Sequence, residues 1–510
     1  MKQDQPQADV CIILEGTYPY VSGGVSGWTH QLLEAHSDLT FHLLLLLAPD
    51  VKDDIKPKYQ VPDNVIGMTK IILQKIPKGS KHVFKLQSIL QELEPHFRQI
   101  IHQGGLNDMI EIIELIKPLR KKLGSHLLLN SKAAWAQCIE IYKKDYSTSP
   151  FIDYFWTWRA LFGGLYSILL EKLPSAKVYH AVSTGYAGIC LARAQYETGR
   201  PALLTEHGIY TNERRIEIAM ADWLFEDKLF SDLSVQKDEG DLKNMWLNAF
   251  LTYSKCTYDT CYQIITLYEG NQEFQKEDGA DPEKLRIIPN GINVEEYEHI
   301  EREPFLPPTI GLIGRVVPIK DIKTYIRTCA LTKKSVPDLM AYICGPTEED
   351  EEYYQECVDL VNYLGLEETI IFTGKINIKE YFTKMHLSVL TSISEAQPLV
   401  ILEAGAAGIP SVTTDVGACR EMILGGSAEE PFLGKAGDVV NLSDPEAMSK
   451  AVVKLLTDKE HYDSCCKAIQ NRVRKYYNKV DLDITYKKLY KSCCQMDDDF
   501  SLSNHKNQSI

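Results

Sequence analysis

Glu395 and Glu403 bracket an apolar segment of the chain that contains Pro398. The segment is expected to be a loop that turns into a buried helix, because proline fits a first turn, where its missing N–H is harmless. Glu395 would precede the helix, beside free backbone N–H groups that favour an anion. Glu403 would lie inside it, where a carboxylate is costly without partners, and sugar or ribose hydroxyls are suitable partners. An ordinary helix start with one exposed glutamate is the alternative.

A basic pair follows a short buried strand predicted at residues 309–314. Arg315 comes directly after this strand, and Lys320 precedes a helix expected over residues 322–333. Open α/β sheets bind ligands at the carboxyl ends of their strands. A guanidinium and an ammonium together suit a pyrophosphate. The alternative is that both residues are solvated cations of a surface loop. The two glutamates that follow in the same half of the chain favour a binding site.

These four side chains resemble the donor-binding signature of retaining glycosyltransferases with the GT-B architecture, specifically glycosyltransferase family four. The resemblance implies that Arg315 and Lys320 hold the diphosphate of a nucleotide sugar. It also implies that Glu395 contacts sugar hydroxyls and that Glu403 contacts the ribose diol. Arg315, Lys320 and Glu395 would be catalytic in this interpretation.

Two residues between the glutamates complete the implied donor site. Gln397 is included as a substrate contact, and Leu399 is expected to offer its backbone N–H to the diphosphate. Many members of the family have Gly-Phe or Gly-Leu after the first glutamate, whereas this chain has Ala396 and Gln397. This departure concerns the sugar pocket and not the nucleotide site.

The N-terminal half offers a glycine loop and a histidine. Gly23 and Gly24 follow a strand predicted at residues 10–14 and precede a helix expected to begin near residue 26. Adjacent glycines allow positive φ and close approach to a ligand, although a plain tight turn explains them equally well. The resemblance implies that this loop closes over the donor phosphates. His207, after a strand predicted at 202–206, resembles the active-site histidine of the family, although a lone histidine is more often structural.

Local sequence narrows the resemblance to the subfamily that builds the Pel exopolysaccharide in bacteria; the matching stretches are residues 15–19, 155–159, 179–188 and 205–218. In that subfamily, the charged residues after the histidine loop are candidates for acceptor or donor contacts, namely Glu213, Arg214 and Arg215. A charged first turn of a surface helix is the alternative.

The implied reaction transfers a hexosyl unit, with retention at the anomeric carbon, from a UDP-sugar of the UDP-glucose or UDP-N-acetylhexosamine type to a growing exopolysaccharide. Side-chain cations would stabilise the leaving diphosphate, so no metal and no cofactor beyond the donor are expected. A phosphorylase would need a pyridoxal-bearing lysine, which is not identifiable, and a nucleotide-sugar epimerase remains an alternative. A catalytically silent nucleotide-sugar-binding subunit of a synthase complex should have lost a phosphate cation or Glu403, and both are present.

Composition restricts the partners and the location. The chain has 510 residues, 25% of them charged, and a net charge of −15, which argues against general nucleic-acid binding. The basic run at residues 117–122 could touch an anionic membrane or a partner, but a solvated helix end is the simpler interpretation. We expect a cytoplasmic protein, peripheral at the inner face of the cell membrane, whose partners are a nucleotide-sugar donor, a glycan acceptor and an inner-membrane polysaccharide synthase complex.

Alternating short strands and helices predict an α/β protein with two Rossmann-like, doubly wound domains facing a cleft, the GT-B architecture. The first domain is expected at residues 1–295, with a helical insertion at about 79–175, and the nucleotide-sugar-binding domain at 309–476. A last helix at 477–495 is expected to cross back to the first domain. The tail at 496–510 is acidic and polar and is expected to be disordered.

Overall fold

The computed structural model describes residues 7–51, 55–213, 240–301, 303 and 307–506. Contacts divide the chain into two compact units. Unit 1 comprises Met1–Thr266, Gln272–Arg286 and Tyr486–Ile510, and unit 2 comprises Leu267–Asn271 and Ile287–Thr485. Each unit is built around one sheet, so the prediction of two Rossmann-like domains is confirmed. No helix within the described ranges is both long and apolar enough to cross a bilayer.

The sheet of unit 1 has seven strands in the order β3-β2-β1-β4-β5-β6-β7. Its inner strands read as continuous apolar runs, as expected for parallel strands covered on both faces, and all seven residues of β2 are buried. The strands are β1 (Ala8–Glu15), β2 (Phe41–Leu47), β3 (Val65–Ile72), β4 (Ala176–Ala181), β5 (Ala202–Glu206), β6 (Gln263–Thr266) and β7 (Leu285–Ile287). The order reverses between β1 and β4, which pair directly in parallel.

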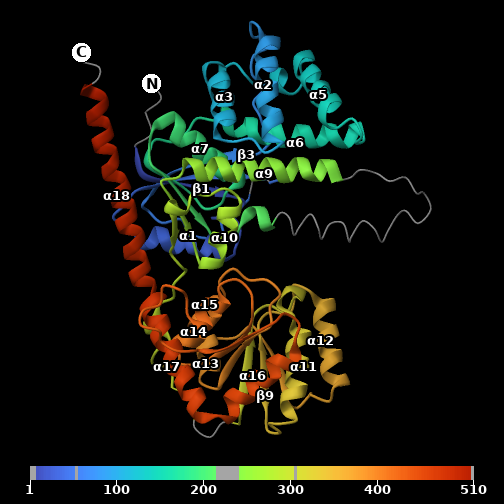
Figure 1. Cartoon of the computed structure of the whole chain (residues 1–510), viewed down its shortest axis with the longest axis vertical. Coiled ribbons are helices and arrows are strands. Elements are labelled where there is room, and N and C mark those ends of the chain that lie inside the picture. The colour runs from blue at the N-terminus through green and yellow to red at the C-terminus, as the bar shows by residue number, and fades with distance from the viewer. Residues whose placement is uncertain (1–6, 52–54, 214–239, 302, 304–306, 507–510) are drawn as a thin grey trace, which may run out of the picture. The chain divides into compact units, whose positions relative to one another are not determined.

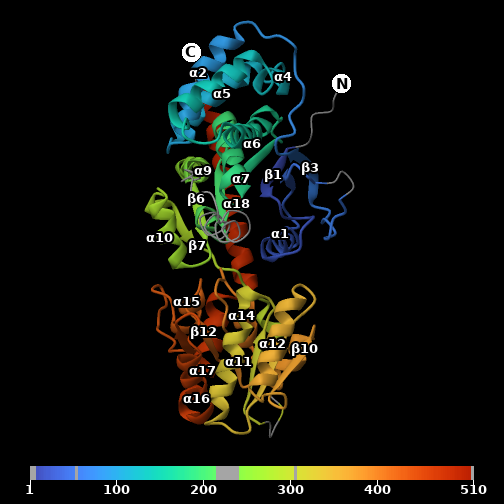
Figure 2. The ribbon, with the colours of Figure 1, turned by 90° about the vertical axis from the view of Figure 1, so that its right-hand side faces the viewer.

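Helices cover this sheet (Figures 1 and 2). The part of the chain that follows β3 and precedes β4 forms a separate helical layer. The sheet-packing helices are α1 (Gly24–Ala35), α7 (Gly185–Thr198), α9 (Gly240–Thr260) and α10 (Glu269–Glu277). The helical layer, here called the insertion, contains α2 (Leu86–Ile100), α3 (Leu106–Ile116), α4 (Ser125–Leu128), α5 (Lys132–Asp145) and α6 (Phe151–Leu170). Its helices share a hydrophobic core with the sheet, and four aromatic side chains of α6 are buried in that core: Tyr154, Trp158, Phe162 and Tyr166.

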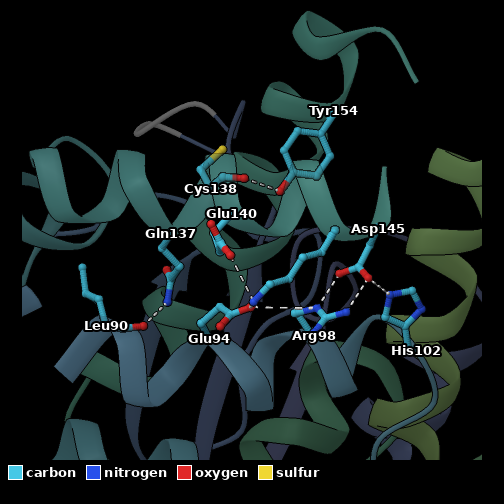
Figure 3. Close-up of polar contacts among 10 residues, drawn as sticks. Leu90, Glu94, Arg98, His102, Gln137, Cys138, Glu140, Asp145 and Tyr154 are labelled. Atoms are coloured by element: carbon cyan, nitrogen blue, oxygen red, sulfur yellow. Dashed lines mark hydrogen bonds and ion pairs between the residues drawn. The ribbon is translucent and has the colours of Figure 1, made fainter. Parts of the chain in front are cut away.

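Polar contacts also join α2 to α5 in the insertion (Figure 3). The guanidinium of Arg98 donates two hydrogen bonds of 2.6 Å to the carboxylate of Asp145. Burial alone would raise the pKa of Asp145, but Arg98 outweighs this effect and lowers it. Lys144 lies 3.1 Å from Glu94, and Gln137 donates to the Leu90 carbonyl at 2.7 Å. These bonds hold α2 and α5 together along their length.

The sheet of unit 2 has six parallel strands in the order β10-β9-β8-β11-β12-β13. They are β8 (Thr309–Ile313), β9 (Met340–Cys344), β10 (Ile370–Gly374), β11 (Leu387–Leu390), β12 (Ser411–Thr414) and β13 (Gly437–Val440). The helices are α11 (Ile322–Lys333), α12 (Glu351–Tyr363), α13 (Ile378–Phe382), α14 (Leu399–Ala406), α15 (Cys419–Leu424), α16 (Pro445–Thr457) and α17 (Lys459–Tyr476). The sequence does not predict β13, because its four residues include a glycine and an aspartate and lie at the sheet edge.

The boundary between the units differs from the expected break after residue 295. Ile292 donates its backbone N–H to the Tyr477 carbonyl at 3.0 Å, and its own carbonyl accepts from Lys479 at 2.9 Å. The turn at residues 289–293 therefore belongs to unit 2, which begins again at Ile287. Backbone hydrogen bonds to residues that are distant in sequence hold the turn there.

The last helix, α18 (Lys479–Lys506), begins in unit 2 and belongs to unit 1 from Tyr486 onward. In unit 1, Tyr490 donates or accepts a 2.7 Å hydrogen bond with Nδ1 of the buried His180. The helix continues beyond residue 495, where we expected it to end, through Lys506. A helix that is already packed adds further residues at low cost, because nucleation is the expensive step, so the polar tail need not break it. Residues 507–510 of the predicted disordered tail lie outside the described residues.

Candidate functional site

The carboxyl edge of the second sheet brings together two loops that carry predicted site residues. The strand order reverses between β8 and β11, which are direct neighbours in the sheet. Arg315 and Lys320 lie in the loop after β8, and Glu395 lies in the loop after β11. A reversal of strand order leaves a crevice where open α/β sheets bind ligands. The sequence predicted the strand ends but not that these two strands are adjacent.

Backbone and hydroxyl contacts hold the two loops side by side. The Ile393 N–H donates to the Ile319 carbonyl at 2.8 Å. The Thr391 hydroxyl donates to the Lys320 carbonyl at 2.8 Å, and the Thr414 hydroxyl donates to the Ser392 carbonyl at 2.7 Å. None of these contacts is made by the side chain of Lys320 or Glu395, so replacing either side chain leaves all three in place.

Lys320 and Glu395 form an ion pair across these loops. Their side chains are 19% and 15% exposed, so the pair is only partly screened by water. The Ser392 hydroxyl donates to the same carboxylate oxygen, Oε1, at 2.7 Å. The ammonium and carboxylate are thus fixed next to each other, and each keeps capacity for further hydrogen bonds. Such a pair can offer a cation to a phosphate and an acceptor to a hydroxyl at the same time.

Arg315 is less constrained than Lys320. It pairs with Glu349, and the two side chains are 53% and 50% exposed. An exposed pair of this kind contributes little stability, so its partner can be exchanged for an anionic ligand at small cost. Contacts in the structure connect Arg315 to Glu349 and not to the Lys320–Glu395 pair.

Close backbone approach at this edge requires glycine. A Cβ on Gly417 would lie 2.2 Å from the Glu395 carbonyl oxygen, and its φ is +50°. The next residue, Ala418, donates its N–H to the Ala396 carbonyl at 2.8 Å. A side chain at Gly417 would therefore push the Glu395 loop away, which makes this glycine a positioning residue that the sequence alone did not identify.

Glu403 lies on α14 and is held by Tyr297, with which it shares a side-chain hydrogen bond. Burial raises the pKa of the Glu403 carboxyl, and the bond from Tyr297 opposes that effect. Pro398 is the N-cap of α14 and not, as predicted, part of its first turn. Leu399, predicted to point inward, is 39% exposed because the short helix turns this position outward.

Gln397 has a structural partner that the sequence did not reveal. Its carbonyl oxygen accepts from the Asn290 N–H at 2.8 Å, and its amide donates to the Asn290 carbonyl at 3.0 Å. The side chain is 7% exposed. Gln397 thus anchors the returning chain of unit 2, so its amide has less capacity for a substrate than we expected.

In unit 1, Gly23 and Gly24 precede α1 at the carboxyl end of β1. Neither uses the left-handed backbone we expected, since Gly23 is extended with φ of 167° and Gly24 begins the helix. A Cβ at either position would meet no other heavy atom within 4 Å. These glycines therefore leave open space at the N-terminus of α1. They are not required by a tight turn.

His207 follows β5 and packs against α1. Its ring lies 4.7 Å from that of Trp28, at an interplanar angle of 73°. The residue is 8% exposed, and burial lowers its pKa to about 4, so the imidazole is neutral at neutral pH. Its Nε2 atom is buried and has no hydrogen-bond partner among the described residues. An unsatisfied buried nitrogen is costly, and a ligand hydroxyl would relieve that cost.

Glu206, the residue before His207, is a buried carboxyl that sequence reasoning missed. Tyr258 and Gln275 donate to its Oε2 at 2.9 and 2.8 Å. Burial raises its pKa to about 7, and these two donors limit the rise. The network fixes the end of β5 and thereby the position of His207. The residues around Glu206 in the sequence form no motif that would have indicated this role.

The structure treats the three subfamily candidates differently. Glu213 is exposed, and one carboxylate oxygen lies where a Cβ of Gly208 would be, at 2.2 Å. It therefore folds back over the histidine loop. Arg214 and Arg215 lie outside the described residues.

Comparison with known proteins gives two family matches. Residues 8–283 match the family described as Domain of unknown function (DUF3492). Residues 307–458 match the family described as Glycosyl transferases group 1. The first match covers most of unit 1, and the second covers the strands and helices that carry Arg315, Lys320, Glu395 and Glu403.

Two of the relatives in sequence are a mannosyltransferase and a galactosyltransferase. A lipopolysaccharide core biosynthesis mannosyltransferase of Rhizobium meliloti is 31% identical over 140 residues, 27% of this chain and 40% of the relative. An Escherichia coli UDP-Gal:alpha-D-GlcNAc-diphosphoundecaprenol alpha-1,3-galactosyltransferase is 24% identical over 64% of this chain and 77% of its own length. The fold resembles Anabaena HepE, solved in complex with UDP, with a TM-score of 0.56 at 14% identity over 94% of this chain and 99% of HepE.

Proposed function

We propose that this protein transfers a hexosyl unit from a UDP-sugar to a glycan. The chain belongs to the DUF3492 family and is a GT-B glycosyltransferase of group 1. The proposal rests above all on the fixed Lys320–Glu395 pair where the strand order of the second sheet reverses. The diphosphate of the donor would bind Lys320 and Arg315, and Glu395 would receive hydroxyls of the transferred sugar.

The chemistry follows from the charges. When the glycosidic bond breaks, negative charge develops on the diphosphate, and cations already in place lower that barrier. Lys320 and Arg315 supply two such cations, and the exposed Arg315 can leave Glu349 to reach the phosphates. Charge neutralisation by side chains accounts for our prediction that turnover needs no divalent metal.

Glu403 and His207 have complementary roles in the proposal. Glu403, whose charged form is disfavoured by burial, gains two hydrogen bonds if it accepts both hydroxyls of a ribose. Neutral His207, with its unsatisfied Nε2, would hydrogen-bond a hydroxyl of the transferred sugar. Gly23 and Gly24 leave open space at the start of α1, which suits a phosphate. We propose that both glycines contact the donor phosphates.

The biological product we propose is a Pel-like exopolysaccharide, built with retention at the anomeric carbon. The support is the resemblance of residues 15–19, 155–159, 179–188 and 205–218 to the Pel glycosyltransferase PelF. UDP as the nucleotide is supported by the UDP named for the galactosyltransferase relative and for the HepE complex. The corresponding location is the cytoplasm, at the inner face of the membrane beside a polysaccharide synthase complex.

The test is turnover of the full chain with a panel of UDP-, GDP- and ADP-sugars and a glycan acceptor. We expect release of UDP from UDP-glucose or a UDP-N-acetylhexosamine, with proton NMR showing a product of the same anomeric configuration as the donor. UDP binding without turnover across the acceptors would instead identify a silent nucleotide-sugar-binding subunit. Faster turnover of ADP- or GDP-sugars would contradict the choice of nucleotide.

A further inference from the structure

The insertion of unit 1 has a charge opposite to that of the whole chain. Between β3 and β4, residues 73–175 contain fourteen Lys and Arg against nine Asp and Glu, a net charge of +5 in a chain of −15. A local excess of basic residues in an acidic protein indicates a surface selected for an anionic partner. The donor site described above lies on other segments and does not use these residues.

Two neighbouring loops carry four of these basic residues. The loop before α2 carries Lys78 and Lys81, and the loop before α4 carries Lys121 and Lys122. Ser80 donates its N–H to the Lys122 carbonyl at 2.8 Å, so the loops run together. All four lysines are exposed, and the structure gives none of them an ion-pair partner within the described ranges.

Two glycines allow the backbones of the two loops to approach closely. A Cβ on Gly124 would lie 2.3 Å from the Pro77 carbonyl oxygen, and a Cβ on Gly79 would lie 2.7 Å from the Gly124 backbone nitrogen. The close approach brings the backbones of the two lysine-bearing loops together, and like charges on adjoining loops repel one another. Such an arrangement is expected where an external anion offsets the repulsion.

Exposed aromatic side chains adjoin the basic loops. Phe84, three residues after Lys81, is 78% exposed. On α5 and α6, Trp135 and Trp156 are 50% and 59% exposed, and both pack against Phe155 at centroid distances of 5.8 and 5.2 Å.

Contacts in the insertion connect these tryptophans to the basic loops through α4, which Figure 2 shows beside α5. Arg159 of α6 donates to Leu129 and Asn130, at the end of α4, at 3.3 and 3.0 Å. His126, within α4, donates its N–H to the Lys78 carbonyl at 3.2 Å. Hydrogen bonds thus connect α6 to α4 and α4 to the Lys78 loop, and we call the exposed lysines and aromatic side chains of these connected segments the basic-aromatic face.

We propose that the basic-aromatic face binds the surface of an anionic lipid bilayer. Lysines are depleted in protein–protein interfaces, whereas an anionic bilayer attracts clustered lysines without requiring fixed geometry. Tryptophan is enriched at the membrane–water interface, because its ring is apolar and its N–H is polar. The combination of unpaired lysines with half-exposed tryptophans favours lipid over an acidic protein.

The test is co-sedimentation of the full chain with vesicles of phosphatidylcholine, with and without phosphatidylglycerol. We expect binding to the vesicles that contain phosphatidylglycerol only, weakening as salt is added. A basic side chain near such a surface is worth about 1 kcal/mol, or roughly fivefold in partitioning, so Lys121→Ala with Lys122→Ala should weaken binding about 25-fold. A second pair, Lys78→Ala with Lys81→Ala, should weaken it by a similar factor.

Trp156→Ala tests the aromatic half of the face and should weaken binding to the same vesicles at every salt concentration. The matched controls are Lys459→Ala and Tyr363→Ala in unit 2, whose side chains are 85% and 86% exposed and should leave binding unchanged. Circular dichroism and melting temperature check that each variant is folded. Absence of vesicle binding, equal binding to neutral vesicles, or equal losses in the controls would overturn the proposal. Capture of an acidic protein by the face without any lipid binding would overturn it as well.

Discussion

Replacing Lys320 with alanine should lower turnover roughly 10- to 150-fold. The change removes a charge-assisted contact to the donor diphosphate, which is worth about 1.5–3 kcal/mol, and each 1.4 kcal/mol is a factor of ten. Loss of the pair also leaves Glu395 with Ser392 as its remaining partner at 15% side-chain exposure. We therefore expect the free energy of unfolding to fall by about 1–2 kcal/mol, between the values for exposed and buried pairs.

The assay is initial-rate UDP release at saturating donor, together with a urea melt of each variant. Lys323→Ala is the matched control, since Lys323 lies in the neighbouring helix and also pairs with a glutamate, Glu356, at 2.6 Å. The control should lose little stability and no turnover, because its pair is exposed and neither member belongs to the proposed donor site. Turnover of Lys320→Ala within twofold of the unmodified chain would refute the assigned phosphate contact.

Three further predictions concern the carboxylates and the metal requirement. Glu403→Gln should weaken calorimetric binding of UDP, whereas Glu395→Gln should leave UDP affinity nearly intact and reduce transfer, because its contacts act as the glycosidic bond breaks; the reverse order would show that the two roles are exchanged. Glu206 has a folded-state pKa of about 7, raised above the unfolded value, so its contribution to stability falls by about 3 kcal/mol as pH rises from 4.5 to 7. Glu206→Gln should remove that part of the pH dependence from thermal melts, and an unchanged pH profile would argue against a protonated carboxyl. Turnover should survive EDTA, and its loss with recovery on adding Mg²⁺ would reveal a metal site.

The sequence predicts the sheets well because their strands are strongly patterned. The run of β2 is apolar at every position except His42 and is bounded by polar turns, so both its position and its type are evident. The edge strand β13 is missed, since burial on one side only leaves Gly437 and Asp438 without a periodic signal. Boundaries between units are also missed where they depend on contacts distant in sequence, as between Ile292 and Tyr477.

The sequence predicts which residues belong to the candidate site, but it does not predict which of them contact each other. Arg315, Lys320 and Glu395 are evident from their places after strands, yet their pairing depends on which strands are neighbours, which pattern alone does not determine. Gln397 illustrates the same limit, because its partner Asn290 lies far away in the sequence. Glycine at 417 is needed only because the Glu395 loop passes close to it.

The most direct test of the donor site is a crystal structure of the full chain with UDP bound. Our account predicts the diphosphate at the carboxyl edge of the second sheet, within hydrogen-bond distance of Lys320 Nζ and of the Arg315 guanidinium. It also predicts the ribose hydroxyls on the carboxylate of Glu403. A diphosphate bound elsewhere, with the Lys320–Glu395 pair unchanged and its loops empty, would contradict the account.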